Sequence, residues 1–298
     1  MSEVHEAGGL DVAMVWDLLG QVAPRDLRGA REQAHWAVQV IAAAGETFCA
    51  HEADTSHTSM SWDAALAGLV GRALPGEAAC RIGVRVPDLA LCLLGPDGVP
   101  RAELRLAGRT LPEAYRWTSE AFRAATRGAA GRPWIPPGFE LPEHALAHGG
   151  RFARDPGLAE LARWFGNADA ALHRLAQQTR GAGPVRCWPH HFDIASLIEI
   201  EPGQVGRAAR TVGVGLSPGD ASIDEPYLYV NHSPATSRLA LPPLAAGEWI
   251  REGWIGAALR GSQIVAAGDA AAQESLLRAF LASAVPASRA LALGGPMG

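Results

Sequence analysis

Residues 82–106 read IGVRVPDLALCLLGPDGVPRAELRL, and this stretch decides the fold class. Two short apolar runs, at residues 82–86 and 89–94, precede a Gly-Pro-Asp-Gly turn, and a third run at residues 102–106 follows it. Short apolar runs separated by turn residues are typical of consecutive antiparallel strands. The stretch therefore predicts a three-stranded antiparallel meander.

The meander lies between two expected helices. Residues 24–44 carry apolar side chains at helical spacing, and Gly45 follows as a stop signal. Thr110 and Glu113 have the spacing of a capping box, which predicts a second helix that continues to Ala125. The first half of the chain thus has the order helix, strands, helix.

The second half repeats this order. Asp155 is a typical helix cap, and the apolar pattern after it predicts a helix to about Gln178, with a last helix at residues 270–284. Further extended segments are expected at residues 47–50, 58–62, 192–200, 211–216, 227–230, 249–251 and 254–259. Because the strands are grouped between helices, we expect an α+β fold with antiparallel sheets and flanking helices. The repeated order allows two similar helix-strands-helix halves.

Residues 131–150 are rich in Gly and Pro and show no periodic pattern. We expect them to connect an N-terminal half, residues 1–130, to a C-terminal half, residues 151–290. The pattern leaves open whether the two halves form one joint domain or two.

The composition excludes several classes of protein. The chain of 298 residues has a net charge of -5 and contains no lysine. Its arginines are scattered among acids and do not form the clustered positive field that nucleic acids require, so we expect no nucleic-acid partner. A pyridoxal-phosphate (PLP) Schiff base and the P-loop of nucleotide hydrolases both need a lysine. We therefore expect no PLP and no P-loop nucleotide.

Cysteine spacing and the N-terminal residues bear on the compartment. The four cysteines lie far apart without a Cys-x-x-Cys pair, which is typical of buried small side chains and not of disulfides. The N-terminal residues lack the basic and apolar regions of a signal peptide. No apolar run approaches the roughly 20 residues of a membrane span. We expect a cytoplasmic protein without membrane contact.

The segment CWPHHFDI at residues 187–194 is the richest in chemically active side chains. On a strand, His191 and Asp193 would point to the same side, because side chains alternate between the two faces. With His232 they would form a triad of two histidines and one carboxylate, which holds a divalent metal such as iron. The structural alternative places His191 and Asp193 on a hydrogen-bonded or solvated face of a strand whose other face is buried.

A second polar group lies around His57, and His35 and Gln39 are one helical turn apart on the helix before it. The other members of this group are His51, Asp54, Ser59, Ser61 and Asp63. If these residues face one another, a hydroxyl group would lie beside an imidazole, as nucleophilic catalysis requires. The chain has no Gly-x-Ser-x-Gly elbow, so solvated loop residues are the alternative. His57 is a candidate catalytic residue, in addition to the pair in the CWPHHFDI segment.

Nine tryptophans are many for a chain of this size. Aromatic side chains anchor cores more often than they bind ligands, but an aromatic wall beside histidines is what a small-molecule pocket requires. The candidate ligand-binding residues are His35, Gln39, Trp62, Trp188 and Tyr229.

Three segments resemble those of an uncharacterised family of bacterial proteins of unknown function. They are HWAVQ at residues 35–39, WPHHFDIA at residues 188–195 and EPYLY at residues 225–229. Because they are spread over most of the chain, the resemblance implies that the chain is one unit. It implies no activity and no catalytic residue.

Two hypotheses of function follow. In the first, the protein handles a small molecule, most simply as an enzyme, in a pocket between the two halves that is lined by His, Asp and Trp side chains. In the second, it is a non-catalytic binding or assembly module whose tryptophans and sheet edges form a partner surface. A deep pocket favours the first hypothesis, and large exposed apolar patches favour the second.

Overall fold

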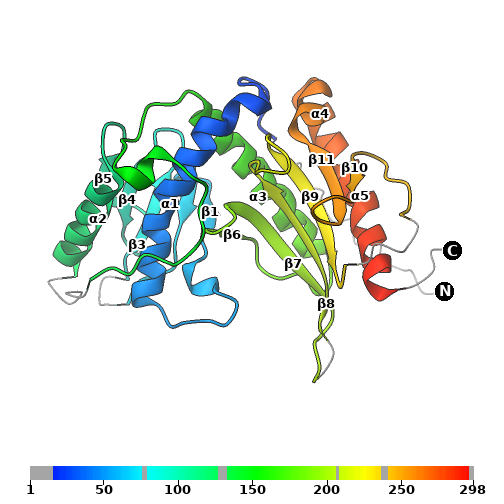
Figure 1. The fold of residues 1–298 in the computed structure, drawn as a ribbon, viewed down its shortest axis with the longest axis horizontal. Helices are drawn as coiled ribbons and strands as arrows, with labels where there is room; N and C mark the ends of the chain where they lie inside the picture. Colours follow the sequence, from blue (N-terminus) through cyan, green and yellow to red (C-terminus); the bar gives the residue numbers. More distant parts are fainter. Residues whose placement is uncertain (1–15, 76–78, 127–132, 206–207, 236–240, 295–298) are drawn as a thin grey trace, which may run out of the picture.

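The computed structural model describes residues 16–75, 79–126, 133–205, 208–235 and 241–294. These residues form two antiparallel sheets of five and six strands with five α-helices (Figure 1). The expected α+β class with antiparallel sheets and flanking helices is confirmed.

The first sheet has five strands in sequential order. The strands are β1 (Ser61–Asp63), β2 (Gly68–Val70), β3 (Arg81–Arg85), β4 (Ala90–Leu94) and β5 (Pro100–Arg105). Helices α1 (Arg28–Phe48) and α2 (Leu111–Ala125) pack against this sheet. The predicted meander is confirmed as β3 to β5. The capping box of α2 is also confirmed, because Thr110 and Glu113 each accept a hydrogen bond from the other's backbone amide.

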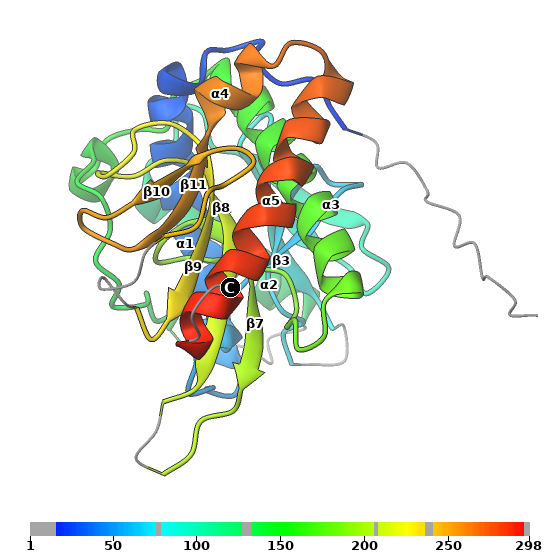
Figure 2. The same cartoon turned by 90° about the vertical axis from the view of Figure 1, so that its right-hand side faces the viewer.

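The second sheet has six strands in the order β10-β11-β9-β8-β7-β6. The strands are β6 (Arg186–Trp188), β7 (Asp193–Glu201), β8 (Arg210–Ser217), β9 (Tyr227–Ser233), β10 (Glu248–Ile250) and β11 (Gly256–Arg260). Helices α3 (Gly157–Gln178) and α5 (Ala270–Leu293) lie on one side of this sheet (Figure 2), and the short helix α4 (Gly261–Ala266) follows β11. We call the opposite side the open face.

The register of β7, β8 and β9 decides which side chains share a face. Ile194, Leu216 and Leu228 are paired with one another and are buried in the main core, on the side of α3 and α5. Because side chains alternate along a strand, Asp193 and Tyr229 lie on the open face. The open face therefore carries Asp193 together with the aromatic side chains of Tyr227 and Tyr229.

The two sheets meet edge to edge. Met60, just before β1, and Cys187 in β6 form an isolated antiparallel bridge with N–O distances of 3.0 and 2.8 Å. Arg31 of α1 forms an ion pair of 2.6 Å with Asp224 of the β8–β9 connection. Buried side chains from both halves also belong to one continuous apolar cluster. The two halves thus share a core.

The segment that follows α1 differs from the prediction. Gly45 does not end the helix, which continues to Phe48, so the extended structure expected at residues 47–50 is wrong. Residues Ser56–Thr58 form a 3-10 helix, η2. A Cβ atom on Gly45 would lie 2.3 Å from the His57 carbonyl oxygen. The missing side chain therefore lets η2 pack directly against α1, and this contact is the role of the glycine.

Helix α5 is longer than expected and continues to Leu293. Among the described residues it is the one helix that is long and apolar enough to cross a membrane, with a mean hydropathy of 1.4 over a window that is 50% buried. The expectation that no apolar stretch reaches this length is therefore corrected. The finding is weak evidence of a membrane span, because core helices of soluble proteins pass the same test.

Candidate functional site

The CWPHHFDI segment forms a hairpin and not a continuous strand. Strand β6 ends at Trp188, β7 begins at Asp193, and these two residues are paired. The chain reverses over residues 189–192, where Phe192 has a φ of 57° and its amide donates a 2.7 Å hydrogen bond to the Trp188 carbonyl. A buried phenylalanine rarely adopts this left-handed conformation, so the surrounding contacts must hold it. The expected alternation of His191 and Asp193 along one strand is therefore wrong.

Helix α1 holds this hairpin in place. The Pro189 carbonyl accepts hydrogen bonds from His35 Nε2 at 2.9 Å and from Gln39 Nε2 at 2.8 Å. The His35 ring stacks on Phe192, with ring centroids 5.1 Å apart. Burial lowers the pKa of His35 to about 4, so the ring is neutral and Nε2 carries the proton that it donates. The structure thus brings His35 and Gln39 to the site, where they position the hairpin.

A cleft of about 510 Å³ opens where the hairpin, the start of α1 and the β8–β9 connection meet. Its titratable lining residues are Arg28, Arg31, Glu32, His35, Glu140, His190, His191, Asp220 and Asp224. Arg31 donates to Asp224 at 2.6 Å, and Arg28 donates to Glu32 at 2.9 Å. Acids therefore neutralise both cations of the cleft.

His190 was not among the predicted site residues, but it lies in this cleft. Its ring centroid is 4.4 Å from that of His191. Burial, together with the neighbouring His191, lowers the pKa of His190. Its Nδ1 atom is buried and has no hydrogen-bond partner among the described residues. One of the three imidazoles at the cleft, that of His190, thus has a buried nitrogen without a partner among the described residues.

A smaller pocket of about 220 Å³ adjoins the cleft on the open face, and we call it the side pocket. Two residues, His191 and Asp220, line both spaces. The complete lining of the side pocket is His191, Asp193, Ser217, Asp220, Tyr227, Tyr229, Asn231 and Trp254. The hairpin, β8, β9 and the segment before β11 all contribute to it.

Asp193 and Tyr229 form a hydrogen bond across an intervening strand. Tyr229 on β9 donates its hydroxyl to Asp193 Oδ2 on β7 at 2.5 Å, although β8 lies between the two strands. Gly215 of β8 makes this possible, because a Cβ atom there would lie 2.6 Å from the Tyr229 hydroxyl oxygen. The tyrosine ring can therefore lie flat across β8.

The other carboxylate oxygen of Asp193, Oδ1, is buried and has no hydrogen-bond partner among the described residues. Burial raises the pKa of Asp193, while the hydrogen bond from Tyr229 and the charge of His191 act in the opposite direction. Burial also raises the pKa of Tyr229 well above its ordinary value. A carboxyl group with a raised pKa and a free oxygen at a pocket wall is suited to accept or donate a proton.

A second tyrosine–aspartate pair lines the same pocket. Tyr227 donates its hydroxyl to Asp220 Oδ2 at 2.5 Å. Asp220 Oδ1 already accepts the backbone amides of Ser222 and Ile223, at 2.7 and 3.0 Å. Both oxygens of Asp220 are therefore occupied. Sequence reasoning missed this pair, although the alternation of Tyr227 and Tyr229 on one strand places both rings on one face.

The structure separates His232 from the other two residues of the expected metal triad. His232 shares a strand face with Val230, which is buried in the main core, so it lies on the side of α3 and α5. Asp193 lies on the open face near the other end of the sheet. The triad of His191, Asp193 and His232 is therefore corrected. Both ring nitrogens of His232 are buried without a hydrogen-bond partner among the described residues.

The two predicted tryptophans lie in different places. Trp188 is the cross-strand partner of Asp193 and lines a groove of about 490 Å³ on the open face, together with Asp193 and Tyr229. Trp62 instead stacks on Phe165 of α3, with ring centroids 6.0 Å apart, and lines neither the cleft nor the side pocket. Trp188 thus belongs to the site region, and Trp62 does not.

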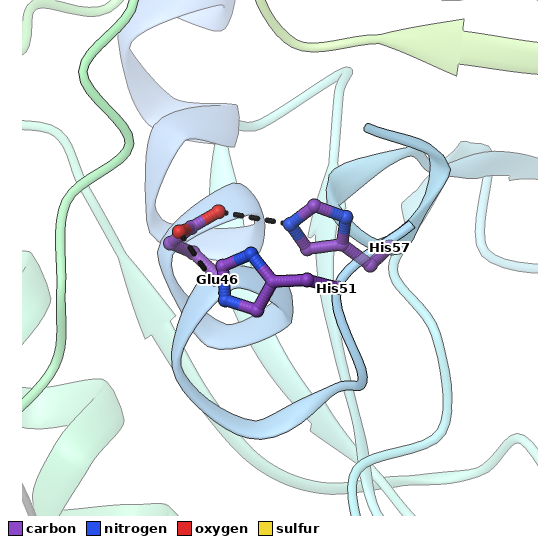
Figure 3. A group of neighbouring side chains, drawn as sticks. All are labelled: Glu46, His51 and His57. Carbon is purple, nitrogen blue, oxygen red and sulfur yellow. Dashed lines mark hydrogen bonds and ion pairs between the residues drawn. The ribbon is translucent and has the colours of Figure 1, made fainter. Parts of the chain in front are cut away.

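His57 belongs to a separate group with Glu46 and His51, which could hold a metal ion (Figure 3). Its ligand atoms lie within 4.8 Å of one another. His57 Nε2 is 2.9 Å from Glu46 Oε2, and His51 Nε2 is 3.6 Å from Glu46 Oε1. His57 Nδ1 accepts the amide of Glu52 at 3.2 Å, so in the structure Nε2 carries the proton and donates to Glu46.

The comparisons with known proteins found no matching protein family, no matching curated protein and no matching solved structure. The fold and the two groups of side chains thus stand on the chain's own geometry. The cleft with its side pocket and the Glu46 group are the two candidate sites.

Proposed function

We propose that the protein is an enzyme that acts on a small molecule in the cleft and its side pocket, with Asp193 and Tyr229 as the proton-transferring pair. The single observation that carries this proposal is the buried Oδ1 atom of Asp193, which has no hydrogen-bond partner among the described residues and belongs to a side chain that lines the side pocket. Leaving a buried acceptor without a hydrogen bond costs about 1–3 kcal/mol, and a ligand that donates to it recovers this cost.

The geometry gives each neighbouring group a role in that chemistry. The hydrogen bond from Tyr229 to Oδ2 fixes the orientation of the Asp193 carboxylate, and with it the position of Oδ1. His191 lies where the cleft joins the side pocket and can contact a ligand that occupies both. His35 and Gln39 hold the hairpin that carries His191. In this proposal Asp193 and Tyr229 transfer the proton, and α1 positions the hairpin that leads to Asp193.

The alternative of an assembly module has less support. The exposed large apolar side chains among the described residues are Leu18, Val99, Ile135, Leu197, Val205 and Leu293. Only six large apolar side chains are exposed among the described residues, and individual exposed apolar side chains are normal on a protein surface, so they are no evidence of a partner surface. The two adjoining cavities favour a small-molecule ligand.

A fragment screen by ligand-observed NMR tests the proposal. We expect a subset of neutral and charged fragments to bind the wild-type protein and to bind Asp193→Asn at least tenfold more weakly. Compounds related to the bound fragments should be chemically changed during prolonged incubation with the wild-type protein but not with the variant. Asp169→Asn is the matched control, because burial also raises the pKa of Asp169, to about 6, and this residue lines a different cavity. If Asp193→Asn binds every fragment as tightly as the wild-type protein does, the proposal is wrong.

Metal binding at Glu46, His51 and His57 is a second candidate function, favoured by the short distances within the group. One carboxylate and two imidazoles are ligands that zinc accepts. Coordination through His57 Nε2 would move the proton of the neutral ring to Nδ1, where the Glu52 amide already donates. Binding therefore requires this hydrogen bond to break, which opposes it by about 1 kcal/mol.

Zinc titration followed by elemental mass spectrometry tests this second candidate. One zinc per chain is expected for the wild-type protein and at least a tenfold weaker site for His51→Ala. His148→Ala is the control, because His148 pairs with Glu143 at 2.6 Å on the surface. Equal zinc binding by wild type and His51→Ala would remove this function from consideration.

A further inference from the structure

The side pocket has a negative lining. It contains two carboxylates, Asp193 and Asp220, one histidine, His191, and no arginine, so the carboxylates outnumber the groups that can carry a positive charge. The chain has no lysine that could supply a cation there. In the adjoining cleft, Arg28 and Arg31 are already paired with acids. An anionic ligand would therefore meet repulsion in the side pocket, whereas a cation would meet attraction.

Three aromatic rings form the apolar part of this lining. The ring centroid of Trp254 lies 6.2 Å from that of Tyr227 and 6.4 Å from that of Tyr229, and the two tyrosines are 6.3 Å apart. The Trp254 ring folds over β11 at Gly256, where a Cβ atom would lie 2.4 Å from the ring. Both tyrosine hydroxyls donate to carboxylates, which increases the electron density of their rings. Electron-rich rings attract cations to their faces.

The two carboxylates differ in what they can still accept. Asp220 receives three hydrogen bonds, from one tyrosine hydroxyl and two backbone amides. Asp193 receives one from Tyr229, and its buried Oδ1 has no hydrogen-bond partner among the described residues. A ligand that satisfies Oδ1 must carry a hydrogen-bond donor. A ligand that also suits the rings and the charge must carry that donor on a cation.

We propose that the side pocket binds a protonated amine, whose ammonium group donates an N–H to Asp193 Oδ1 and lies against the rings of Tyr229 and Trp254. This inference rests on the proposed function and names the class of its ligand. The rest of the amine extends past His191 and Asp220 into the cleft, which is more than twice as large as the side pocket. Asp220 contributes negative charge without direct contact.

Three probes of similar shape and different charge test the inference on the full chain. Benzylamine is a cation at neutral pH, benzyl alcohol is neutral and benzoate is an anion. We expect benzylamine to bind at least tenfold more tightly than benzyl alcohol, as measured by isothermal titration calorimetry, and benzoate to show no binding. Equal affinities for the three probes, tighter benzoate binding or no benzylamine binding would overturn the inference.

Two variants test whether the bound amine contacts Asp193 and Trp254. Asp193→Asn keeps the shape of the side chain and should remove the preference for benzylamine over benzyl alcohol, while Asp169→Asn should leave it unchanged. Trp254→Leu should weaken benzylamine at least threefold more than benzyl alcohol. A benzylamine preference that survives Asp193→Asn would overturn the inference, as would equal losses for both probes in Trp254→Leu.

The fragment screen separates failure of this inference from failure of the proposed function. If neutral or anionic fragments bind in an Asp193-dependent way and amines do not, the cleft is a ligand site for another class of molecule. If no fragment depends on Asp193, both the inference and the proposed function are wrong.

Discussion

The side pocket and the Glu46 group both place carboxylates near histidines, yet they differ in how far their polar atoms are satisfied. In the Glu46 group, His57 is only 4% exposed and both of its ring nitrogens have partners, while His51 is largely exposed to solvent. In the side pocket, a carboxylate oxygen of Asp193 is buried without a partner among the described residues. A satisfied group needs no ligand to be stable, whereas the side pocket gains from one.

Each group also depends on a glycine that allows two chain segments to approach closely. Gly45 lets η2 reach α1 and so brings His57 to Glu46. Gly215 lets the Tyr229 ring cross β8 to reach Asp193. The comparison therefore predicts that small changes in the backbone will disturb either group selectively.

The largest expected effect concerns His35, which holds the hairpin of the cleft and has no counterpart in the Glu46 group. Its pKa is about 4 in the folded protein and 6.5 as a free side chain, because burial opposes the charge. Between these pH values the unfolded chain binds a proton that the folded protein excludes, so stability falls as the pH falls through this window. The total loss is about 3 kcal/mol.

Urea denaturation from pH 7 to pH 4 measures this loss. His35→Gln should flatten the pH dependence, because glutamine does not titrate. The charged and titratable groups that face His35 are His190, His191 and Arg31, and all three oppose its protonation. If the stability of wild type and variant depends equally steeply on pH, the loss of stability comes from the titration of other groups and not from His35.

Gly215→Ala should have the next largest effect. The added methyl group would lie 2.6 Å from the Tyr229 hydroxyl oxygen and 2.8 Å from the Ala195 methyl group, so the ring must move. We expect a loss of about 2 kcal/mol in the free energy of unfolding, typical of overpacking, and a loss of fragment binding in the side pocket. Zinc binding at the Glu46 group should not change. Unaltered fragment binding would mean that Tyr229 is not held as described.

The next effect in size is that of Tyr229→Phe, which should destabilise the protein more than Tyr227→Phe. The first variant leaves the Asp193 carboxylate without its hydroxyl donor, at a cost of about 1–3 kcal/mol. The second variant leaves Asp220 with two backbone amides, so about 1 kcal/mol or less should be lost. Chemical denaturation at pH 7 compares the two. Equal losses of stability would show that Asp193 does not depend on its tyrosine hydrogen bond more than Asp220 does.

The smallest effect is expected for His51→Ala. The side chain is 67% exposed, and its contact with Glu46 is 3.6 Å long, so the free energy of unfolding should change by less than about 0.5 kcal/mol. This variant therefore tests zinc binding without a change in the fold. A larger loss, measured by thermal denaturation in the presence of a chelator, would show that His51 has a structural role.

The regular elements could be predicted from the sequence because their signals are local. The meander over β3 to β5, the capping box at Thr110 and the helix after Asp155 each follow from patterns within a few residues. The extent of α1 could not be predicted, because Gly45 reads as a stop in the sequence and serves as a close contact in space. A glycine has both meanings, and only the partner segment decides between them.

The candidate site was predicted only in part, because some of its features are local in the sequence and others depend on contacts between distant segments. The composition of the CWPHHFDI segment identified His191 and Asp193, and Tyr229 was predicted as one of the aromatic residues that could line a pocket beside the histidines. The hairpin was missed because Phe192 adopts a left-handed conformation, which sequence patterns do not predict for a bulky residue. The pairing of Asp193 with Tyr229 depends on strand order, and His232 was assigned without knowledge of the face that it occupies.

The edge-to-edge junction of the two sheets has a consequence for folding kinetics. Most strand pairs within each sheet join segments that are near in sequence, so each sheet is expected to form early, whereas the Met60–Cys187 bridge closes a loop of more than a hundred residues. Contacts made late stabilise the native state mainly by slowing unfolding. The cleft lies at this junction, between α1 and the hairpin. A ligand that contacts both sides should therefore lengthen the lifetime of the folded protein while leaving its folding rate nearly unchanged.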